Sequence, residues 1–187
     1  MRLFLALDVP AQTRDALVEL QTALPMGRPV PADDLHLTLA FVGEIDGVSA
    51  AALHEEMERL RAPGFDLQAK GIGMFGGASP RALWAGVAPE PLLSRLRDKI
   101  LSALRGVGIE LPRERFRPHF TLARFRRRLP GNDIERLRLF VEERSGFVAM
   151  PFAVTEFALF RSTLRPSGPI YERLAAYPLE PPMGSGF

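Results

Sequence analysis

Two short segments of the chain share the pattern His-x-Thr-Leu-Ala. The first begins at His36 and the second at His119, and the chain has only three histidines in all. Apolar residues alternate with other residues around both histidines, which is typical of a strand with one face in a core. Because residues two apart in a strand share a face, the pattern predicts that His36 lies beside Thr38 and that His119 lies beside Thr121.

These residue types suit chemistry on a phosphodiester. An imidazole titrates near pH 6.5, so two histidines can divide acid and base work close to neutral pH. One can deprotonate the nucleophile while the other protonates the leaving oxygen, and threonine hydroxyls can donate to the phosphate oxygens. We therefore expect His36 and His119 to be catalytic, and Thr38 and Thr121 to bind the phosphate, if the two segments face one cleft.

A metal site is the competing interpretation of two histidines. A third ligand is not evident, because His54 follows a helical pattern beside Glu55 and Glu56 and is interpreted as a surface residue. Asp33 and Asp34 precede the first repeat and are expected to shape a turn. Cysteine is absent, which excludes thiol catalysis and cysteine-bound metals.

The elements that position these residues occur in a repeated order. Composition is that of a globular protein, with 47% hydrophobic and 25% charged residues. Periodicity predicts strands near 2–8, 34–42, 65–72, 82–88, 116–125, 153–160 and 171–179, and helices near 10–24, 49–60, 90–106 and 132–143. We expect an α+β fold with two pseudo-symmetric lobes, each a mostly antiparallel sheet with helices on its outer face and the active-site cleft between them. This bilobal domain spans residues 1–187, with a flexible tail over about 180–187.

Charge divides the chain unevenly. Residues 1–93 hold 7 basic and 12 acidic residues, a balance of −5, whereas residues 94–187 hold 17 and 10, a balance of +7. Seven arginines fall within residues 113–128. Arginine offers a flat donor fork that suits phosphate, so an anionic partner such as RNA is expected, with Arg126, Arg127 and Arg128 as a solvated rim that attracts it. No run is long enough for a membrane span, and we expect a cytoplasmic protein that makes no membrane contact.

Longer stretches around the repeats resemble a known family. They are RLFLALDVP at 2–10, DLHLTLAFVGE at 34–44, LWAGV at 83–87, RPHFTLAR at 117–124 and AVTEFALFRS at 153–162, followed by Gly168 and Tyr171. Together they cover almost the whole chain. The sequence resembles the two-histidine (2H) phosphoesterases, which carry paired HxTx motifs, and within them the RNA 2′,3′-cyclic phosphodiesterases, also called 2′–5′ RNA ligases.

The resemblance implies a hydrolase without metal or other cofactor. It implies that a terminal RNA 2′,3′-cyclic phosphate is opened to a 2′-phosphomonoester, with His119 activating the water and His36 protonating the departing 3′ oxygen. It further implies that Thr38 and Thr121 hold the phosphate. The reverse reaction would join a cyclic phosphate end to a 5′-hydroxyl through a 2′–5′ link.

Several other residues match family positions or lie close to the motifs. Arg124 matches a family arginine, but in a regular strand it falls on the face opposite His119, so the strand must twist or bulge there or the side chain must reach round. Tyr171 also matches a family position, and its side chain is expected either to line the cleft or to pack against other side chains. Phe125 shares the parity of His119 and can offer a stacking surface, whereas Phe41 and Trp84 are expected in the core.

Two alternatives stay open beside the leading hypothesis. One is a phosphodiesterase that acts on another cyclic or 2′–5′ nucleotide, because motifs specify the bond better than the rest of the substrate. The other is a non-catalytic module that binds RNA ends. Binding alone does not require two titrating groups, which favours the enzyme. A monomer is expected.

Overall fold

The strands form one long antiparallel sheet that two lobes share. The computed structural model describes residues 1–125, 129–166 and 168–181. The sheet order is β10-β9-β1-β3-β7-β6-β5, with a short β2 paired to β7. The strands of the sheet are β1 (Arg2–Asp8), β2 (Arg28–Pro29), β3 (His36–Glu44), β5 (Ala69–Phe75), β6 (Ala82–Val87), β7 (His119–Arg124), β9 (Glu156–Arg165) and β10 (Gly168–Pro178). A second, two-stranded sheet pairs β4 (Phe65–Leu67) with β8 (Phe152–Val154).

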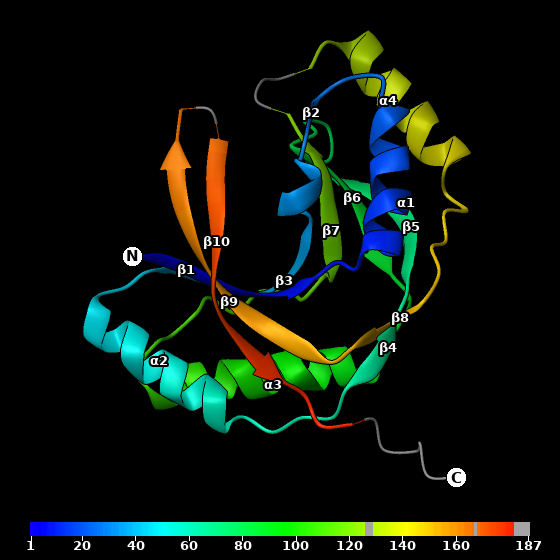
Figure 1. The fold of residues 1–187 in the computed structure, drawn as a ribbon. Helices are drawn as coiled ribbons and strands as arrows, with labels where there is room; N and C mark the ends of the chain where they lie inside the picture. The colour runs from blue at the N-terminus through cyan, green and yellow to red at the C-terminus, as the bar shows by residue number, and fades with distance from the viewer. Residues whose placement is uncertain (126–128, 167, 182–187) are drawn as a thin grey trace, which may run out of the picture.

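The two lobes meet at a narrow junction between β3 and β7. Only Leu37 and Phe120 are paired there among the described residues. Strands β10, β9, β1 and β3 make the first lobe, and β7, β6, β5 and β2 make the second (Figure 1). This arrangement agrees with the predicted α+β fold of two pseudo-symmetric lobes.

Within the described residues, four α-helices cover the sheet. They are α1 (Ala11–Thr22), α2 (Gly47–Arg59), α3 (Pro91–Gly106) and α4 (Gly131–Glu143), and a short 3₁₀ helix, η1 (Ala32–Asp34), precedes β3. Helix α1 packs against β7, and α3 packs against β3 and α2. Helices α1 and α4 lie together on the second lobe, while α2 and α3 lie on the first (Figure 1). Each helix that follows β1 or β6 therefore crosses to the other lobe, which ties the two lobes together.

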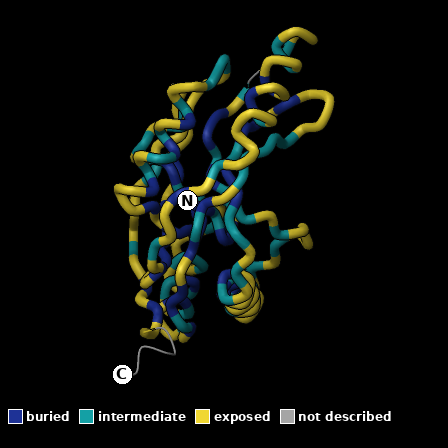
Figure 2. The backbone as a smooth tube through the Cα atoms, turned by 90° about the vertical axis from the view of Figure 1, so that its right-hand side faces the viewer, coloured by how far each residue is buried: buried dark blue, intermediate teal, exposed yellow. Residues whose placement is uncertain are grey.

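Apolar spacing and capping explain the helices. In α3, Leu93, Leu96 and Ile100 are buried at helical spacing, and the Glu90 carboxylate accepts from the Leu92 backbone N–H at 2.8 Å. The buried faces of helices and strands form one large core, and Phe4, Ala6, Ala158 and Phe160 form a second, smaller cluster. Helix outer turns and loop tips are exposed (Figure 2). No helix within the described ranges is both long and apolar enough to cross a membrane.

The structure departs from the predicted elements mainly at strand ends. The strand predicted over 65–72 is divided into β4 and β5, and the one over 153–160 into β8 and β9. Residues 116–118 are irregular, so β7 begins at His119 itself. At the C-terminal end, the Glu180 backbone donates to Ala62 and accepts from Gly64. The tail predicted to be flexible over about 180–187 thus begins with a hydrogen-bonded residue, and its residues 182–187 lie outside the described part of the chain.

Candidate active site

Both histidine strands carry a β-bulge at the same position of the motif. Along β1, Leu5 pairs with Ala40 and Ala6 pairs with Thr38, so Leu39 has no partner in the register. Along β6, the register likewise omits Leu122 of β7. A bulge inserts one extra residue and reverses which face the following residues occupy.

The bulges change which side chains accompany the histidines. Ala40 and Ala123, which regular alternation would place on the same face as the histidines, are buried instead. The next residues, Phe41 and Arg124, are turned onto the exposed side. The core position predicted for Phe41 is therefore wrong, since its side chain is 47% exposed. The parity difficulty at Arg124 is resolved by the bulge, which brings this residue to the face of His119.

The antiparallel junction pairs the two motifs crosswise. Because Leu37 is the partner of Phe120, His36 falls opposite Thr121, and Thr38 falls opposite His119. The cavity linings agree with this placement. His36 and Thr121 line a cavity of about 330 Å³, Thr38 and His119 line a hollow of about 490 Å³, and His36 and Thr38 line a third hollow together. The structure thus brings the four motif residues together at one junction.

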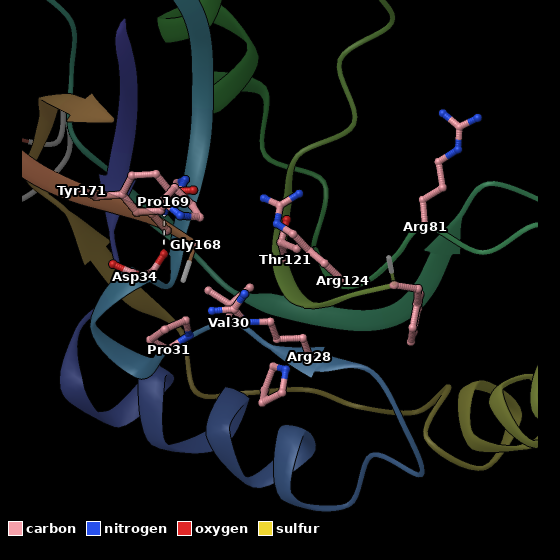
Figure 3. A pocket seen from close by; sticks show the side chains of 13 residues that line it. Arg28, Val30, Pro31, Asp34, Arg81, Thr121, Arg124, Gly168, Pro169 and Tyr171 are labelled. Carbon is pink, nitrogen blue, oxygen red and sulfur yellow. Dashed lines mark hydrogen bonds between the residues drawn. The ribbon is translucent and has the colours of Figure 1, made fainter. Parts of the chain in front are cut away.

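The cavity beside His36 also contains the three further residues proposed from sequence. Arg124, Phe125 and Tyr171 all line it. Figure 3 shows Tyr171 on the β10 side of the cavity and Thr121 with Arg124 on β7 opposite. Phe125 is half-buried and packs partly against the core. It lines the cavity as predicted, but the bulge means that regular alternation from His119 is not the reason.

Backbone carbonyls orient both imidazole rings. His36 Nδ1 lies 2.7 Å from the Asp34 carbonyl oxygen, and His119 Nδ1 lies 2.6 Å from that of Arg117. A carbonyl can only accept, so each Nδ1 carries the hydrogen and each Nε2 is the atom that can gain or lose a proton. Asp34, expected to shape a turn, therefore acts through its backbone to fix the ring of His36.

Aromatic rings hold each imidazole from the side. Tyr171 meets the His36 ring edge-on at 5.2 Å between centroids, and Phe4 lies 4.9 Å from the same ring. Phe75 meets the His119 ring edge-on at 4.8 Å. This packing restricts the rings to orientations in which Nε2 stays directed away from the carbonyls.

Burial and positive charge lower the pKa of both histidines. The pKa of His36 falls to about 4, chiefly because burial disfavours the imidazolium, with Arg124 and His119 adding repulsion. The pKa of His119 is also lowered, by burial first and then by Arg124. Burial raises the pKa of Tyr171, and Arg124 acts against that rise. Arg124 thus influences three cleft residues, which places its guanidinium among them.

Sequence reasoning did not identify two further arginines of this cavity. Arg28 is the register partner of Arg124 in β2, and Arg81 stands just before β6, whose first residue pairs with Arg124. Gly168 has a φ of +128°, and an added Cβ there would lie 2.9 Å from the Arg28 guanidinium. The glycine in the family-like stretch was the available signal for this close approach.

The remaining sequence candidates lie apart from this cavity. Trp84 is half-buried rather than in the core, and its ring lies over Gly73 and 6.4 Å from the His119 ring. His54 is half-buried on α2, where Nδ1 lies 2.9 Å from the Tyr177 hydroxyl. The rim predicted at Arg126, Arg127 and Arg128 lies outside the described residues. In the described part of the chain, no three His, Asp or Glu side chains are grouped as metal ligands would be.

Comparisons with known proteins agree with this geometry. A family model described as the 2′-5′ RNA ligase superfamily matches residues 8–165. An RNA 2′,3′-cyclic phosphodiesterase of Archaeoglobus fulgidus is 32% identical over 95% of this chain and 99% of its own. The enzyme of the same name from Thermus thermophilus is 35% identical over 96% of this chain and 90% of its own.

Solved structures show the same fold. The crystal structure of TT0787 of Thermus thermophilus superposes with a TM-score of 0.79 at 32% identity, over 97% of this chain and 99% of that one. The crystal structure of Escherichia coli LigT complexed with 3′-AMP gives a TM-score of 0.77 at 31% identity, over 95% and 97%. With its paired histidine strands and its match over most of its length, the chain belongs to the 2′-5′ RNA ligase superfamily, a group of two-histidine phosphoesterases.

Proposed function

We propose that this protein hydrolyses terminal RNA 2′,3′-cyclic phosphates to 2′-phosphomonoesters. The observation that carries the proposal is the crosswise placement of two His–Thr pairs at one junction between the lobes. Relatives that share about a third of their residues over nearly the whole chain bear the name RNA 2′,3′-cyclic phosphodiesterase. The site supplies what such a reaction needs: a base, an acid and donors to the phosphate.

The reaction is an in-line displacement at phosphorus. The Nε2 atom of neutral His119 takes a proton from water as the water oxygen bonds to phosphorus. The bond from phosphorus to the 3′ oxygen breaks on the opposite side, and His36 donates its Nε2 proton to that oxygen. The phosphate remains on the 2′ oxygen. A proton then returns from His119 to His36 through solvent, which restores both residues.

Donors around the phosphate stabilise its charge in the transition state. The hydroxyls of Thr38 and Thr121 approach from the two sides of the junction, and the Arg124 guanidinium adds a positive charge beside them. Such preorganised donors act most strongly where charge develops. Tyr171 and Phe125 supply apolar wall to the cavity beside His36, which suits the terminal nucleoside.

The low pKa of His36 has a consequence for its role as acid. In the unliganded protein this ring is neutral at pH 7, because its pKa lies near 4. A bound phosphodiester brings a negative charge between the two histidines and beside Arg124. That charge opposes the repulsion from Arg124 and raises the pKa of His36, so substrate binding itself favours the protonated acid.

The same path run backwards joins a cyclic phosphate end to a 5′-hydroxyl. By microscopic reversibility, the hydroxyl takes the position of the water beside His119 and forms a 2′–5′ link. Catalysis without a metal ion, a cytoplasmic location and a monomeric state remain predictions.

Product analysis tests this function. The protein is incubated with a 2′,3′-cyclic nucleotide in EDTA, and phosphorus NMR compares the product with authentic 2′- and 3′-monophosphates. We expect the 2′-monophosphate. A 3′-monophosphate would reverse the assigned orientation of the ribose, and hydrolysis that requires added divalent ions would contradict the two-histidine mechanism.

A further inference from the structure

Two neighbouring hollows that share part of their lining extend from His119 along α3. The inner hollow, of about 490 Å³, contains His119 and Thr38. The outer hollow, of about 610 Å³, lies between α3 and residues 110–114. Both are lined by Arg97, Leu111, Pro112 and Glu114. The combined surface, here called the arginine groove, therefore runs from the candidate active site to the far end of α3.

Positive charge dominates the arginine groove. Its arginines are Arg97, Arg105, Arg113, Arg115 and Arg117, and its acids are Glu110 and Glu114. Within the described ranges, none of these arginines forms an ion pair with either acid. Elsewhere arginines do pair, as Arg161 does with Glu172. The five arginines against two acids leave a net positive surface. Arg97 Nε donates to the Leu39 carbonyl oxygen at 3.2 Å, so one of these guanidinium groups is partly engaged by the protein.

The local sequence arranges these arginines along the groove. Arg97 and Arg105 are eight residues apart on α3, which places them on one face and about 12 Å apart along the axis. The chain then returns beside the helix, with Arg113, Arg115 and Arg117 at every second position. Phe116 turns inward between them, packs against the core and supports the Arg97 guanidinium at 4.5 Å from its ring centroid.

We propose that the arginine groove binds a single-stranded RNA segment through its backbone phosphates and holds it on the His119 side of the reacting phosphate, where the proposed reverse reaction places the strand that carries the 5′-hydroxyl. Guanidinium forks match phosphate oxygens in pairs. Sites for single strands combine a basic groove with exposed aromatic rings, and Phe41, which is 47% exposed, lines the inner hollow. An acidic protein segment would also meet positive charge, but RNA is favoured because the groove ends at His119, one of the two motif histidines. The proposal rests on the proposed function.

Binding measured against salt tests this proposal. The probe is an RNA of about ten nucleotides, within the usual size of single-strand sites, ending in a 3′-hydroxyl so that it cannot react. Its affinity is measured by fluorescence anisotropy for the wild-type protein and for an Arg105→Gln, Arg113→Gln double variant. Losing two phosphate contacts should weaken binding and reduce the slope of log K against log salt by about 1.4, at about 0.7 per contact.

A matched variant and a small substrate complete the experiment. Arg95→Gln removes the same charge from α3 at an exposed position that does not line the groove, so it should bind RNA like wild type. The double variant should hydrolyse a 2′,3′-cyclic mononucleotide at the wild-type rate, because neither arginine touches the reacting phosphate.

Three results would overturn the proposal: an unchanged salt slope in the double variant, an equal loss of binding in Arg95→Gln, or loss of mononucleotide hydrolysis in a double variant that melts like wild type. If wild type fails to hydrolyse the mononucleotide, the proposed function fails, while the anisotropy result still decides whether the groove binds RNA.

Discussion

The strands β3 and β7 carry the same motif but differ at the first residue beyond it. Both show the same sequence of half-buried and buried residues, and both bulge at the leucine that follows the threonine. The bulge turns Phe41 outward in one lobe and Arg124 in the other. What the lobes share is thus the His–Thr pair, and what distinguishes them is an apolar ring against a cation. This difference makes two similar histidines inequivalent.

The side chain of Arg124 lies nearer to one side of the junction. Arg124 lines the cavity that contains His36 but not the hollow that contains His119. The pKa of His36 is lowered to about 4, and that of His119 is lowered as well. A symmetric pair of motifs therefore supplies two groups of one chemical type in unequal surroundings, and the proposed acid, His36, needs the charge of the bound phosphate to raise its lowered pKa.

Removing either histidine should have the largest effect. His36→Ala and His119→Ala should each reduce turnover of a 2′,3′-cyclic mononucleotide by about 10²–10⁴-fold, because each removes a proton-transfer group. Initial rates measure this, and circular dichroism melting shows that the fold is kept, since both side chains face the cleft. Near-normal turnover in either variant would contradict the assignment of acid and base.

Replacing the residues that follow the two motifs, Arg124 and Phe41, should have a smaller effect than removing a histidine. Arg124→Met removes a charged donor to the phosphate and should lower kcat/KM by about 10–150-fold, on the scale of 1.5–3 kcal/mol for a hydrogen bond to a charged group. Phe41→Met, at the equivalent position of β3, serves as its control and should lower it much less. Steady-state kinetics of the two variants give the comparison, and equal losses would mean that the difference between the lobes has no role.

The two threonines should behave alike. Thr38→Val and Thr121→Val each remove one hydroxyl donor to the phosphate while keeping the shape, and each should lower kcat about tenfold, at about 1.5 kcal/mol per hydrogen bond. Turnover at saturating substrate measures both. A large loss in one variant alone would show that the crosswise symmetry of the junction does not extend to the phosphate.

The pH dependence should show the smallest effect. Both histidine pKa values are lowered from 6.5, so the bell-shaped kcat/KM profile should have its optimum below pH 6.5. Positive charge at Arg124 disfavours both imidazolium forms, so its removal raises both pKa values. In Arg124→Met the whole profile should move to higher pH, while in Phe41→Met it should not. A movement to lower pH would show that Arg124 does not act on the histidines.

The sequence predicted the elements and the four motif residues because both depend on local periodicity. The strands at His36 and His119 follow from alternation, and α3 follows from its buried leucines. The crosswise pairing could not be predicted, because it depends on the register of Leu37 with Phe120 across the junction. Arg28 lies in the cavity because the two-residue strand β2 pairs with β7, and this long-range pairing could not be predicted either.

The sequence contains a weak signal for the bulges, which the search for alternating residues did not detect. In each motif a leucine is followed by an alanine, so two apolar residues stand together where strict alternation requires one. That doublet marks the reversal of faces that exposes Phe41 and brings Arg124 to the cleft. An alanine is small enough to stand on the polar face beside the histidine and threonine. The doublet therefore did not rule out regular alternation, and the pattern favoured a regular strand.

The most direct test of unequal roles for the two histidines replaces the leaving oxygen. In a 2′,3′-cyclic nucleotide with sulfur at the 3′ position, the leaving group is a thiolate, which needs no proton because thiols have a pKa of about 8.5. His36→Ala should then regain a rate close to that of wild type on the same substrate, whereas His119→Ala, which lacks the base, should stay inactive. Recovery of His119→Ala, or of neither variant, would contradict the assignment of His36 as the acid on the 3′ side and His119 as the base.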